Sequence, residues 1–559
     1  MPQLTTDFDT HEVINQPPVF EDANLFESDL CLKETVAREG GGDAFAQLSQ
    51  YGRRIGSAEV IDLGRQANTY LPVLKSFDQF GHRADVVEFH PAYHELMALS
   101  VTQGIHSSPW EHFADGGTAA SGRNVTRLAG LYMAVQVEAG HMCPITMTNA
   151  AVPALQVQPN LAATWVPRIL SRTYDPAFKR ASEKAGVTIG MGMTEKQGGT
   201  DVRANMTTAE PAQGGGAGEE YLITGHKWFF SAPMCDAFLI LAQAPGGLSC
   251  FLMPRFLPDG TVNAIRIQRL KEKVGNKSNA SSEVEFQRAH AWLIGEEGRG
   301  VRNIIEMATY TRVDCAVSSS GLMRQGLAQA LHHCSHRRVF QKHLIDQPLM
   351  QNVLADMALE VEGSTALAFR VARAFDEADA SLSEAAYRRI MNPVSKYWAC
   401  KRAPGFTYEA MECLGGNGYV EEGVMGRLYR EAPVNAIWEG SGNVMCLDLL
   451  RAVGGDPDGI EAVLSEFETV RGRQRDYDKA LDQLKDRFTE VGSLELRARR
   501  VVEEMAKIGA AAVLLNGAPT AVADSYCRTR LGGEASALYG GLPADLPFKE
   551  ILDRARPAL

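Results

Sequence analysis

The stretch Gly192-Met193-Thr194-Glu195-Lys196-Gln197-Gly198-Gly199-Thr200-Asp201 places small residues and hydroxyls where a strand is expected to give way to a loop. Gly198 and Gly199 carry no Cβ atom, so the backbone N–H groups there can approach a pyrophosphate closely. The hydroxyls of Thr194 and Thr200 can bond a flavin edge or a phosphate oxygen. A tight turn with a capping Thr is the structural alternative. The order of the residues favours a bend that holds a flat cofactor.

A second run, Gly225-His226-Lys227-Trp228-Phe229-Phe230-Ser231, is typical of a β-strand. Successive side chains of a strand point to opposite faces, so Phe229 and Ser231 share one face. An aromatic ring beside a hydroxyl suits a flat cofactor, because stacking excludes water from one face and the hydroxyl can form a hydrogen bond to its edge. A core strand with incidental aromatic residues is the alternative. The upstream Thr194 favours contact with a cofactor.

Length and composition indicate a large globular protein. Its 559 residues exceed what one hydrophobic core usually serves, and 45% hydrophobic with 22% charged residues is ordinary for a soluble chain. The net charge of −12 opposes nonspecific attraction to nucleic acid or anionic membranes over the whole surface. Ten scattered cysteines without a Cys-x-x-Cys pair indicate reduced thiols, and no apolar run is long enough to cross a bilayer. We expect a cytoplasmic protein with no membrane contact.

Four regions follow one another along the chain. Residues 1–185 have mainly helical periodicity after a less regular arm, and residues 186–295 contain six short β-favouring runs. Long helical stretches return in residues 296–453, and residues 454–559 add further helical segments. We expect an α+β protein that is mostly α: a helical lobe, a central antiparallel β-barrel or sandwich, a four-helix-type bundle and an additional C-terminal helical domain.

Two further motifs complete a family pattern. They are Glu412-Cys413-Leu414-Gly415-Gly416-Asn417-Gly418-Tyr419 and Ile437-Trp438-Glu439-Gly440-Ser441-Gly442. Together with the first two runs and the order of the regions, they resemble the acyl-CoA dehydrogenase flavoproteins over about residues 90–453. Passages such as Lys273 to Phe286, and the additional C-terminal region, resemble the AidB alkylation-response branch of that family.

The resemblance implies FAD as the cofactor, and a homo-oligomer, expected to be a tetramer, in which a neighbouring subunit helps to complete each cofactor site. Arg337 and Phe340 match the family's Arg-x-x-Phe, which reaches the pyrophosphate of a neighbour's FAD, whereas a solvated helix charge is the alternative for Arg337. A guanidinium fork suits phosphate oxygens.

Two cofactor positions differ from the simple family pattern or have a second explanation. Glu412 stands where most members carry Gln, and an ionised carboxylate accepts hydrogen bonds but donates none. Ser441 matches a hydroxyl beside the flavin, and a plain helix N-cap explains it almost as well. The implied cofactor-binding residues are Met193, Thr194, Gly199, Thr200, Phe229, Ser231, Arg337, Phe340, Glu412, Gly415, Gly416, Ser441 and Asn443.

Glu439 stands at the family's catalytic glutamate position. Dehydrogenation of a thioester needs a base for the α-proton and an acceptor for the β-hydrogen, and flavin N5 is that acceptor. Burial beside an aromatic wall would raise the pKa of Glu439 toward working pH. Its backbone N–H would bond the thioester oxygen. A single Glu near a helix start usually caps the helix or forms an ion pair. The position of Glu439 in the motif favours the role of catalytic base instead.

The substrate pocket is assigned to Arg312 and Trp438. Some relatives place their base just before an Arg on an earlier helix, where this chain has Thr311, which cannot serve. Arg312 either lines the pocket or forms a buried structural ion pair. Trp438 replaces the usual Tyr and can narrow the acyl pocket. His332, His333 and His336 have helical spacing but no supporting carboxylate, so we expect no metal.

The C-terminal region raises the question of DNA. AidB relatives are associated with DNA binding and protection against alkylation, yet from position 456 onward 15 basic residues stand against 18 acidic ones, a net charge of −3. Arginines still cluster, and such clusters on a symmetric oligomer could neutralise duplex phosphates, whereas solvated helix faces are the alternative. The candidate DNA contacts are Arg471, Arg473, Arg475, Arg497, Arg499 and Arg500.

Two functions therefore compete. The first is an FAD-containing acyl-CoA dehydrogenase of weak or narrow activity, with a role in the alkylation-damage response. The second is primarily a protector that binds double-stranded DNA and retains vestigial dehydrogenase chemistry.

Overall fold

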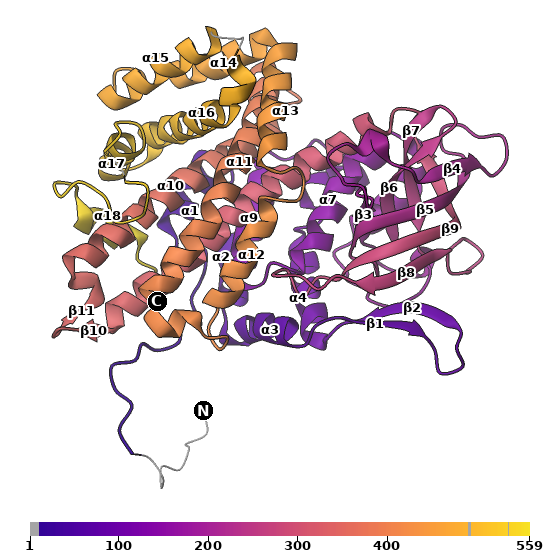
Figure 1. Ribbon diagram of the computed structural model, residues 1–559, viewed down its shortest axis with the longest axis horizontal. Coiled ribbons are helices and arrows are strands. Elements are labelled where there is room, and N and C mark those ends of the chain that lie inside the picture. The colour runs from indigo at the N-terminus through magenta and orange to yellow at the C-terminus, as the bar shows by residue number, and fades with distance from the viewer. Residues whose placement is uncertain (1–9, 490–492, 535, 559) are drawn as a thin grey trace.

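A helical lobe, a β-domain and a long helical bundle follow one another along the chain, and further helices cover one side of the bundle (Figure 1). The computed structural model describes residues 10–489, 493–534 and 536–558. This arrangement confirms the expected fold class. All ten cysteines are buried and unpaired, as their scattered positions predicted. Within the described ranges, every helix is too short or too polar to cross a membrane.

The N-terminal lobe is built around two helices that are buried on almost every side, α6 and α7, which pack on the bundle helix α9. Its helices are α1 (Leu30–Arg38), α2 (Phe45–Ile55), α3 (Ala58–Thr69), α4 (Pro91–Gln103), α5 (His112–Asp115), α6 (Arg123–Val137), α7 (Met142–Gln156) and α8 (Pro159–Ile169). The prediction of an irregular first 70 residues is wrong from α1 onward, because Asp29 and Ser57 cap two regular helices there.

One hairpin in this lobe was not predicted. Strands β1 (Val73–Phe77) and β2 (Arg83–Glu88) pair antiparallel and extend beneath the β-domain in Figure 1. No residue of β1 is fully buried, so the strand lacks the apolar alternation by which a half-buried strand is recognised.

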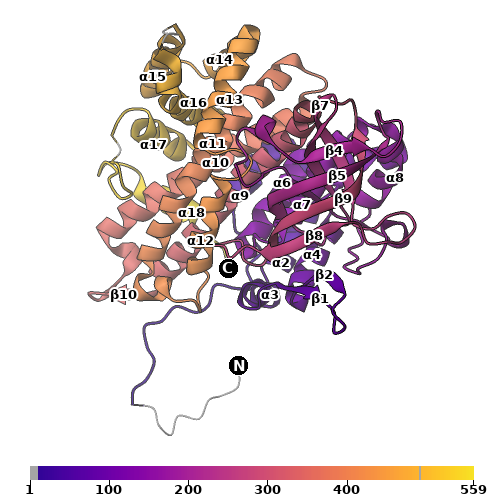
Figure 2. The same ribbon diagram turned by 45° about the vertical axis from the view of Figure 1, so that its right-hand side comes forward.

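The β-domain is a closed sheet. Its strands are β3 (Ile189–Gly192), β4 (Thr208–Pro211), β5 (Glu220–Ser231), β6 (Ala237–Ala244), β7 (Gly247–Pro254), β8 (Ile265–Leu270) and β9 (Ser281–Ile294). β5 pairs with β9, β9 with β7, β7 with β6, β6 with β4, and β4 again with β5, which closes the circuit. Figure 2 shows the domain beside the N-terminal helices, where β3 contacts α7.

Two details of the β-domain differ from the prediction. The sheet is mixed rather than antiparallel, because β3 and β4 run parallel to β6. The runs at 221–223 and 228–230 belong to the single strand β5, whose pairing with β9 shifts register between Lys227 and Phe230. A bulge of this kind interrupts the side-chain alternation, which made one strand look like two.

The bundle consists of three long helices and two shorter ones: α9 (Gly300–His336), α10 (Pro348–Glu377), α11 (Leu382–Cys413), α12 (Met425–Asn435) and α13 (Gly442–Gly455). A tight hairpin of β10 (Arg338–Val339) and β11 (Lys342–His343) separates α9 from α10. α11 continues through Pro393 and Pro404, beyond the stretch that periodicity indicated. Burial of its apolar residues against α9 and α10 outweighs the lost backbone hydrogen bonds.

The C-terminal helices are α14 (Pro457–Glu468), α15 (Arg475–Thr489), α16 (Leu494–Gly517), α17 (Thr520–Arg530) and α18 (Phe548–Ala555). These helices agree with the further helical segments expected in residues 454–559. α16 packs against α10, α11 and α13, and a Cβ atom at Gly509 would lie 2.9 Å from Met391 Cε and 3.3 Å from Leu367 Cδ1. These helices therefore share one hydrophobic core with the bundle.

Candidate active site

A strained loop places Glu439 just before α13. The backbone of Glu439 is left-handed, with φ 58°, and Gly440 follows with φ 105°. A non-glycine residue in this region costs on the order of 1–3 kcal/mol, so neighbouring contacts must hold it. Arg312 on α9 donates from Nε to the Glu439 carbonyl oxygen at 3.1 Å. Lys396 on α11 donates from Nζ to the carbonyl oxygens of Trp438 at 2.9 Å and Gly440 at 2.5 Å.

Arg312 forms the structural ion pair that was one of the two alternatives considered for it. Besides holding the loop, it forms an ion pair from Nη1 to Asp448 Oδ2 on α13 at 2.7 Å. Arg389 pairs with the same carboxylate at 3.0 Å. Arg312 thus ties α9 to the loop and to the helix that follows it. Trp438 is fixed as well, because its Nε1 donates to Asn435 Oδ1 at 3.0 Å.

The environment of Glu439 suits a base. Burial raises the pKa of Glu439, and the Thr311 hydroxyl with the charges of Arg312 and Lys396 limits that rise. Its Oε2 atom is buried and has no hydrogen-bond partner in the described part of the chain. A buried polar atom of this kind is costly unless a ligand or water satisfies it. Thr311 therefore supports the carboxylate although it cannot replace it.

The predicted bend lies at the end of β3. Gly198 has φ 128°, a conformation that favours glycine, and its N–H donates to the Glu195 carbonyl oxygen at 3.0 Å. The Thr194 side chain packs against Gly199, where a Cβ atom would lie 2.4 Å from its Oγ1. Thr200 is exposed beyond the turn, and Met193 accepts a bond from Asn205 Nδ2 through its carbonyl oxygen at 3.1 Å. Only a residue without a side chain fits at position 199.

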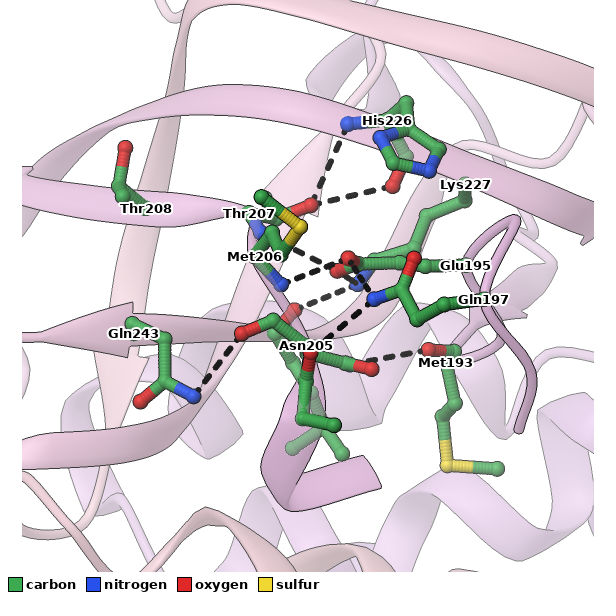
Figure 3. A network of polar contacts seen from close by, with 12 residues as sticks. Met193, Glu195, Gln197, Asn205, Met206, Thr207, Thr208, His226, Lys227 and Gln243 are labelled. Atoms are coloured by element: carbon green, nitrogen blue, oxygen red, sulfur yellow. Dashed lines mark hydrogen bonds and ion pairs between the residues drawn. The ribbon is translucent and has the colours of Figure 1, made fainter. Parts of the chain in front are cut away.

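A buried ion pair that the sequence reasoning missed holds this bend (Figure 3). Lys227 on β5 donates from Nζ to Glu195 Oε1 and to the Leu241 carbonyl oxygen, both at 2.8 Å. Glu195 also accepts from the N–H of Met206 at 2.7 Å. Burial would raise the pKa of Glu195, but Lys227 and these bonds lower it to about 2. The opposite charges of Glu195 and Lys227 within the two motifs were the available signal.

The aromatic wall lies beside the bend. Ser231 pairs with Met191 across β5 and β3, and Phe229 and Ser231 are on the more exposed face while Phe230 is buried, as the alternation predicted. Phe229 is 47% exposed. Lys271 Nζ lies 4.7 Å from the centre of its ring.

Cys143 lies on α7. Burial raises the pKa of the Cys143 thiol to about 12, the charge of Lys273 and hydrogen bonds with Asn279 and Ser231 oppose the rise, and the charge of Glu439 adds to it. The pKa of this thiol therefore depends both on Ser231 of the predicted flavin wall and on Glu439.

A second group of predicted residues lies at the surface, on the β10–β11 hairpin and on the short 3₁₀ helix η6 (Gly415–Tyr419). Phe340 lies at the hairpin tip with φ 50° and is 90% exposed. A Cβ atom added at Gly415 or Gly416 would meet no atom within 4 Å. Glu412, one turn earlier, is exposed and accepts a bond from Tyr408, which raises the pKa of Tyr408. These residues remain open to a partner.

The N-terminal arm, residues 10–20, crosses this second group. Asn15 donates from Nδ2 to the Arg338 carbonyl oxygen at 2.9 Å and accepts from the Arg338 N–H at 2.7 Å. Arg337 donates from Nη1 to the Asn15 carbonyl oxygen at 2.7 Å. Gln16 accepts from Asn417 Nδ2 of η6 at 3.2 Å. The arm thus fixes the hairpin and η6 relative to each other.

Ser441 and Asn443 open α13. Ser441 occupies the N-cap position, as the N-cap alternative expected, but its side chain makes no capping hydrogen bond. Asn443 accepts from Arg499 Nε at 2.8 Å. Across the described chain, no three His, Cys, Asp or Glu side chains gather as a metal site would require. His332 and His336 instead bond the carbonyl oxygens of Pro18 and His332.

Comparison with known proteins covers most of the chain. Residues 15–176 match the adaptive response protein AidB N-terminal domain, residues 190–289 the acyl-CoA dehydrogenase middle domain, and residues 298–454 the acyl-CoA dehydrogenase C-terminal domain. AidB of Escherichia coli (strain K12) is 47% identical over 93% of this chain and 94% of its own. Acyl-CoA dehydrogenase family member 11 of Caenorhabditis elegans is 33% identical over 79% and 72%.

A solved structure agrees over nearly the whole fold. The crystal structure of Caenorhabditis elegans ACDH-11 in complex with C11-CoA has a TM-score of 0.83 and 29% identity, and it covers 98% of this chain and 97% of its own. The fold and site thus define an oxidoreductase of the flavoprotein dehydrogenase class. The chain belongs to the acyl-CoA dehydrogenase family, in the branch that carries the AidB N-terminal domain.

FAD is the cofactor of this family, and the residues present fit it. The buried, unpartnered Glu439 Oε2 and the uncapped Ser441 leave polar groups for ligands to satisfy. The glycines at 415 and 416 leave open space where a side chain would stand. The resemblance seen in the sequence is therefore confirmed at the level of family, enzyme class and cofactor.

Proposed function

We propose that the protein dehydrogenates acyl-CoA thioesters between Cα and Cβ, with Glu439 as the base. The observation that carries the proposal is the buried Oε2 of Glu439, which has no described partner and stands in a loop that Arg312 and Lys396 hold in a strained conformation. A group kept unpartnered at this cost is expected to act on a substrate.

Each residue has a distinct task in this proposal. When bound, FAD supplies the acceptor for the β-hydrogen and its electron pair. Glu439 takes the α-proton on its carboxylate, so that a double bond forms between the two carbons. The backbone N–H of Glu439 donates to no described backbone acceptor and can bond the thioester oxygen. Phe229 and Ser231 cover and hold the ring, with the bend at Met193, Thr194, Gly199 and Thr200 beside it.

We expect a narrow substrate range. The Trp438 indole donates to Asn435, and Asn435 donates to Ser319 Oγ at 3.2 Å. The indole ring therefore cannot change its position without breaking these hydrogen bonds. A rigid, bulky wall distinguishes acyl groups by size. The named ligand of the ACDH-11 structure, C11-CoA, supports including a C11 chain among the candidates.

Anaerobic mixing with acyl-CoA tests the proposal. Purified holoenzyme is mixed with saturated acyl-CoA thioesters of increasing length, C11-CoA included, while the flavin absorbance is followed. We expect bleaching with a limited set of chain lengths, and none with Glu439→Gln, which should retain FAD. Bleaching by Glu439→Gln at the wild-type rate would exclude Glu439 as the base. Failure of every thioester to bleach the wild-type flavin would refute the dehydrogenase.

Duplex DNA binding and a role in the alkylation response remain the alternative prediction. Its candidate arginines are largely engaged within the chain. Arg471 pairs with Glu468 and Asp482, Arg500 pairs with Glu504, and Arg473 donates to the Leu515 carbonyl oxygen. Arg497 contacts Ser493, and Arg475 begins α15. Neutralised arginines release fewer counterions on binding a duplex, so the dehydrogenase is the better supported function.

A tetramer also remains a prediction. We propose that Arg337, Phe340, Glu412, Gly415 and Gly416 contact the FAD of a neighbouring subunit. The support is the exposure of Phe340 at the hairpin tip, of Glu412 at the end of α11 and of Gly415 and Gly416 on η6, with Arg337 half-buried just before the hairpin.

A further inference from the structure

The C-terminal helices reach the start of α13 through one arginine. Arg499 on α16 donates from Nε to Asn443 Oδ1 at 2.8 Å, across 56 residues of sequence. This bond uses the oxygen of the Asn443 amide and leaves its Nδ2 donor without a described partner. The bond to Asn443 uses Arg499 Nε, and the terminal Nη atoms of Arg499 form no hydrogen bond or ion pair with described residues.

A second cation lies on the other side of the same turn. A Cβ atom at Gly442 would lie 2.8 Å from Lys401 Cε and 3.5 Å from its Nζ. Burial raises the pKa of Cys446 on the same helix, and the charges of Arg499 and Lys401 both lower it. The first turn of α13 carries no acidic residue. Glu503, four residues after Arg499 on α16, pairs with Lys507 at 2.5 Å.

We infer that Arg499 is a positioning residue for FAD: it orients the Asn443 amide and adds positive charge where α13 meets the cofactor diphosphate. Free N–H groups, the uncapped Ser441 hydroxyl and two cations together suit a phosphate group. The C-terminal helices would then form part of the cofactor site rather than a separate attachment. This inference rests on the proposed assignment of Ser441 and Asn443 to FAD.

Arg500 provides a matched control. It is the next residue on α16 and is exposed like Arg499, but its Nε donates to Glu504 Oε1 at 2.9 Å instead of to α13. Removing either side chain changes the net charge equally. A loss of FAD affinity that occurs only when Arg499 is removed must therefore come from the position of Arg499.

The experiment measures FAD binding to the full-length apoprotein by quenching of flavin fluorescence. We expect Arg499→Ala to weaken FAD binding by about tenfold or more, since one charge-assisted contact is lost, and Arg500→Ala to change it less than about twofold. Arg499→Lys should restore part of the affinity. Asn443→Ala should weaken binding too, and the double variant should lose less than the sum of both effects. The Tm of each variant apoprotein distinguishes weaker FAD binding from misfolding.

Each outcome decides between the alternatives. Wild-type affinity in Arg499→Ala overturns the inference, as does an equal FAD loss in Arg500→Ala. If both variants lose duplex binding alike while FAD affinity is kept, the two arginines form a DNA patch instead. If the wild-type apoprotein takes up no FAD, the proposed function fails before the role of Arg499 is reached.

Discussion

At the scale of single residues, the site depends on carboxylates whose protonation is controlled by burial. Glu431 is buried and Glu439 is half-buried with a buried Oε2 atom, and both have raised pKa values in different surroundings. The Oε2 atom of Glu439 has no partner, whereas Glu431 accepts from Asn276 N at 2.6 Å and from Asn276 Nδ2 at 2.7 Å. The first is free to react and the second holds a loop. Burial by itself does not separate a base from a structural acid.

Glu431 makes stability depend on pH. Burial raises the pKa of Glu431 to about 7, against an ordinary value of 4.5. Because the folded state then binds the proton more tightly, its contribution to stability is present below about pH 4.5 and is lost as pH rises through 7. Between pH 5 and pH 8 the wild type should lose on the order of 2 kcal/mol of its free energy of unfolding through this group, and Glu431→Gln should not lose it. Thermal unfolding at both pH values measures this, with exposed Glu422→Gln as the control. If the stability difference between Glu431→Gln and the wild type is the same at pH 5 and at pH 8, the predicted role of Glu431 is wrong.

At the scale of elements, buried ion pairs join segments that have little apolar surface of their own. The bend after β3 is exposed from Lys196 to Thr200, so packing alone does not hold it. The pair of Glu195 and Lys227 anchors it to β5, and Arg312 and Lys396 anchor the Glu439 loop to α9 and α11 by hydrogen bonds to backbone carbonyl oxygens. Both loops are held by charged side chains of a neighbouring element.

The Lys227 anchor can be tested by removing one charge. Lys227→Met leaves Glu195 as an unpaired buried carboxylate, which should destabilise the protein by about 3–5 kcal/mol and weaken FAD binding. The double variant Glu195→Gln with Lys227→Met should recover part of that stability, because neither charge remains. Denaturant unfolding followed by circular dichroism measures the change. The exposed neighbour Lys196→Met is the control, and an equal loss there would argue against the anchor.

At the scale of the whole molecule, the predicted cofactor residues divide into two groups. Glu439, Ser231 and Thr194 lie around the wall and the strained loop, whereas Arg337 and Phe340 lie on an outward-facing hairpin tied to the N-terminal arm. If the second group serves a neighbour, each complete site contains residues from two subunits. A shared site of this kind disfavours a functional monomer.

Complementation between inactive subunits tests the shared site. Glu439→Gln lacks the base, and Arg337→Ala should lack the contact to the neighbour's FAD. Co-expressed, the two chains form mixed pairs in which one site of two is intact, so activity should return to about a quarter of the wild-type value. Each variant expressed alone is the control. Failure to regain activity in verified mixed oligomers would place both residues in the same subunit's site.

The sequence by itself determined the order of the regions, the main helices, the family, FAD and the candidate base, because these follow from local periodicity and from motifs of contiguous residues. Tertiary structure alone decided how the parts meet. The parallel pairing of β3 with β6, the anchors Lys227 and Lys396, the arm across Arg337 and the bond from Arg499 to Asn443 all join residues distant in sequence. Such contacts depend on packing and on charge pairing in space, and neither leaves a periodic signal along the chain.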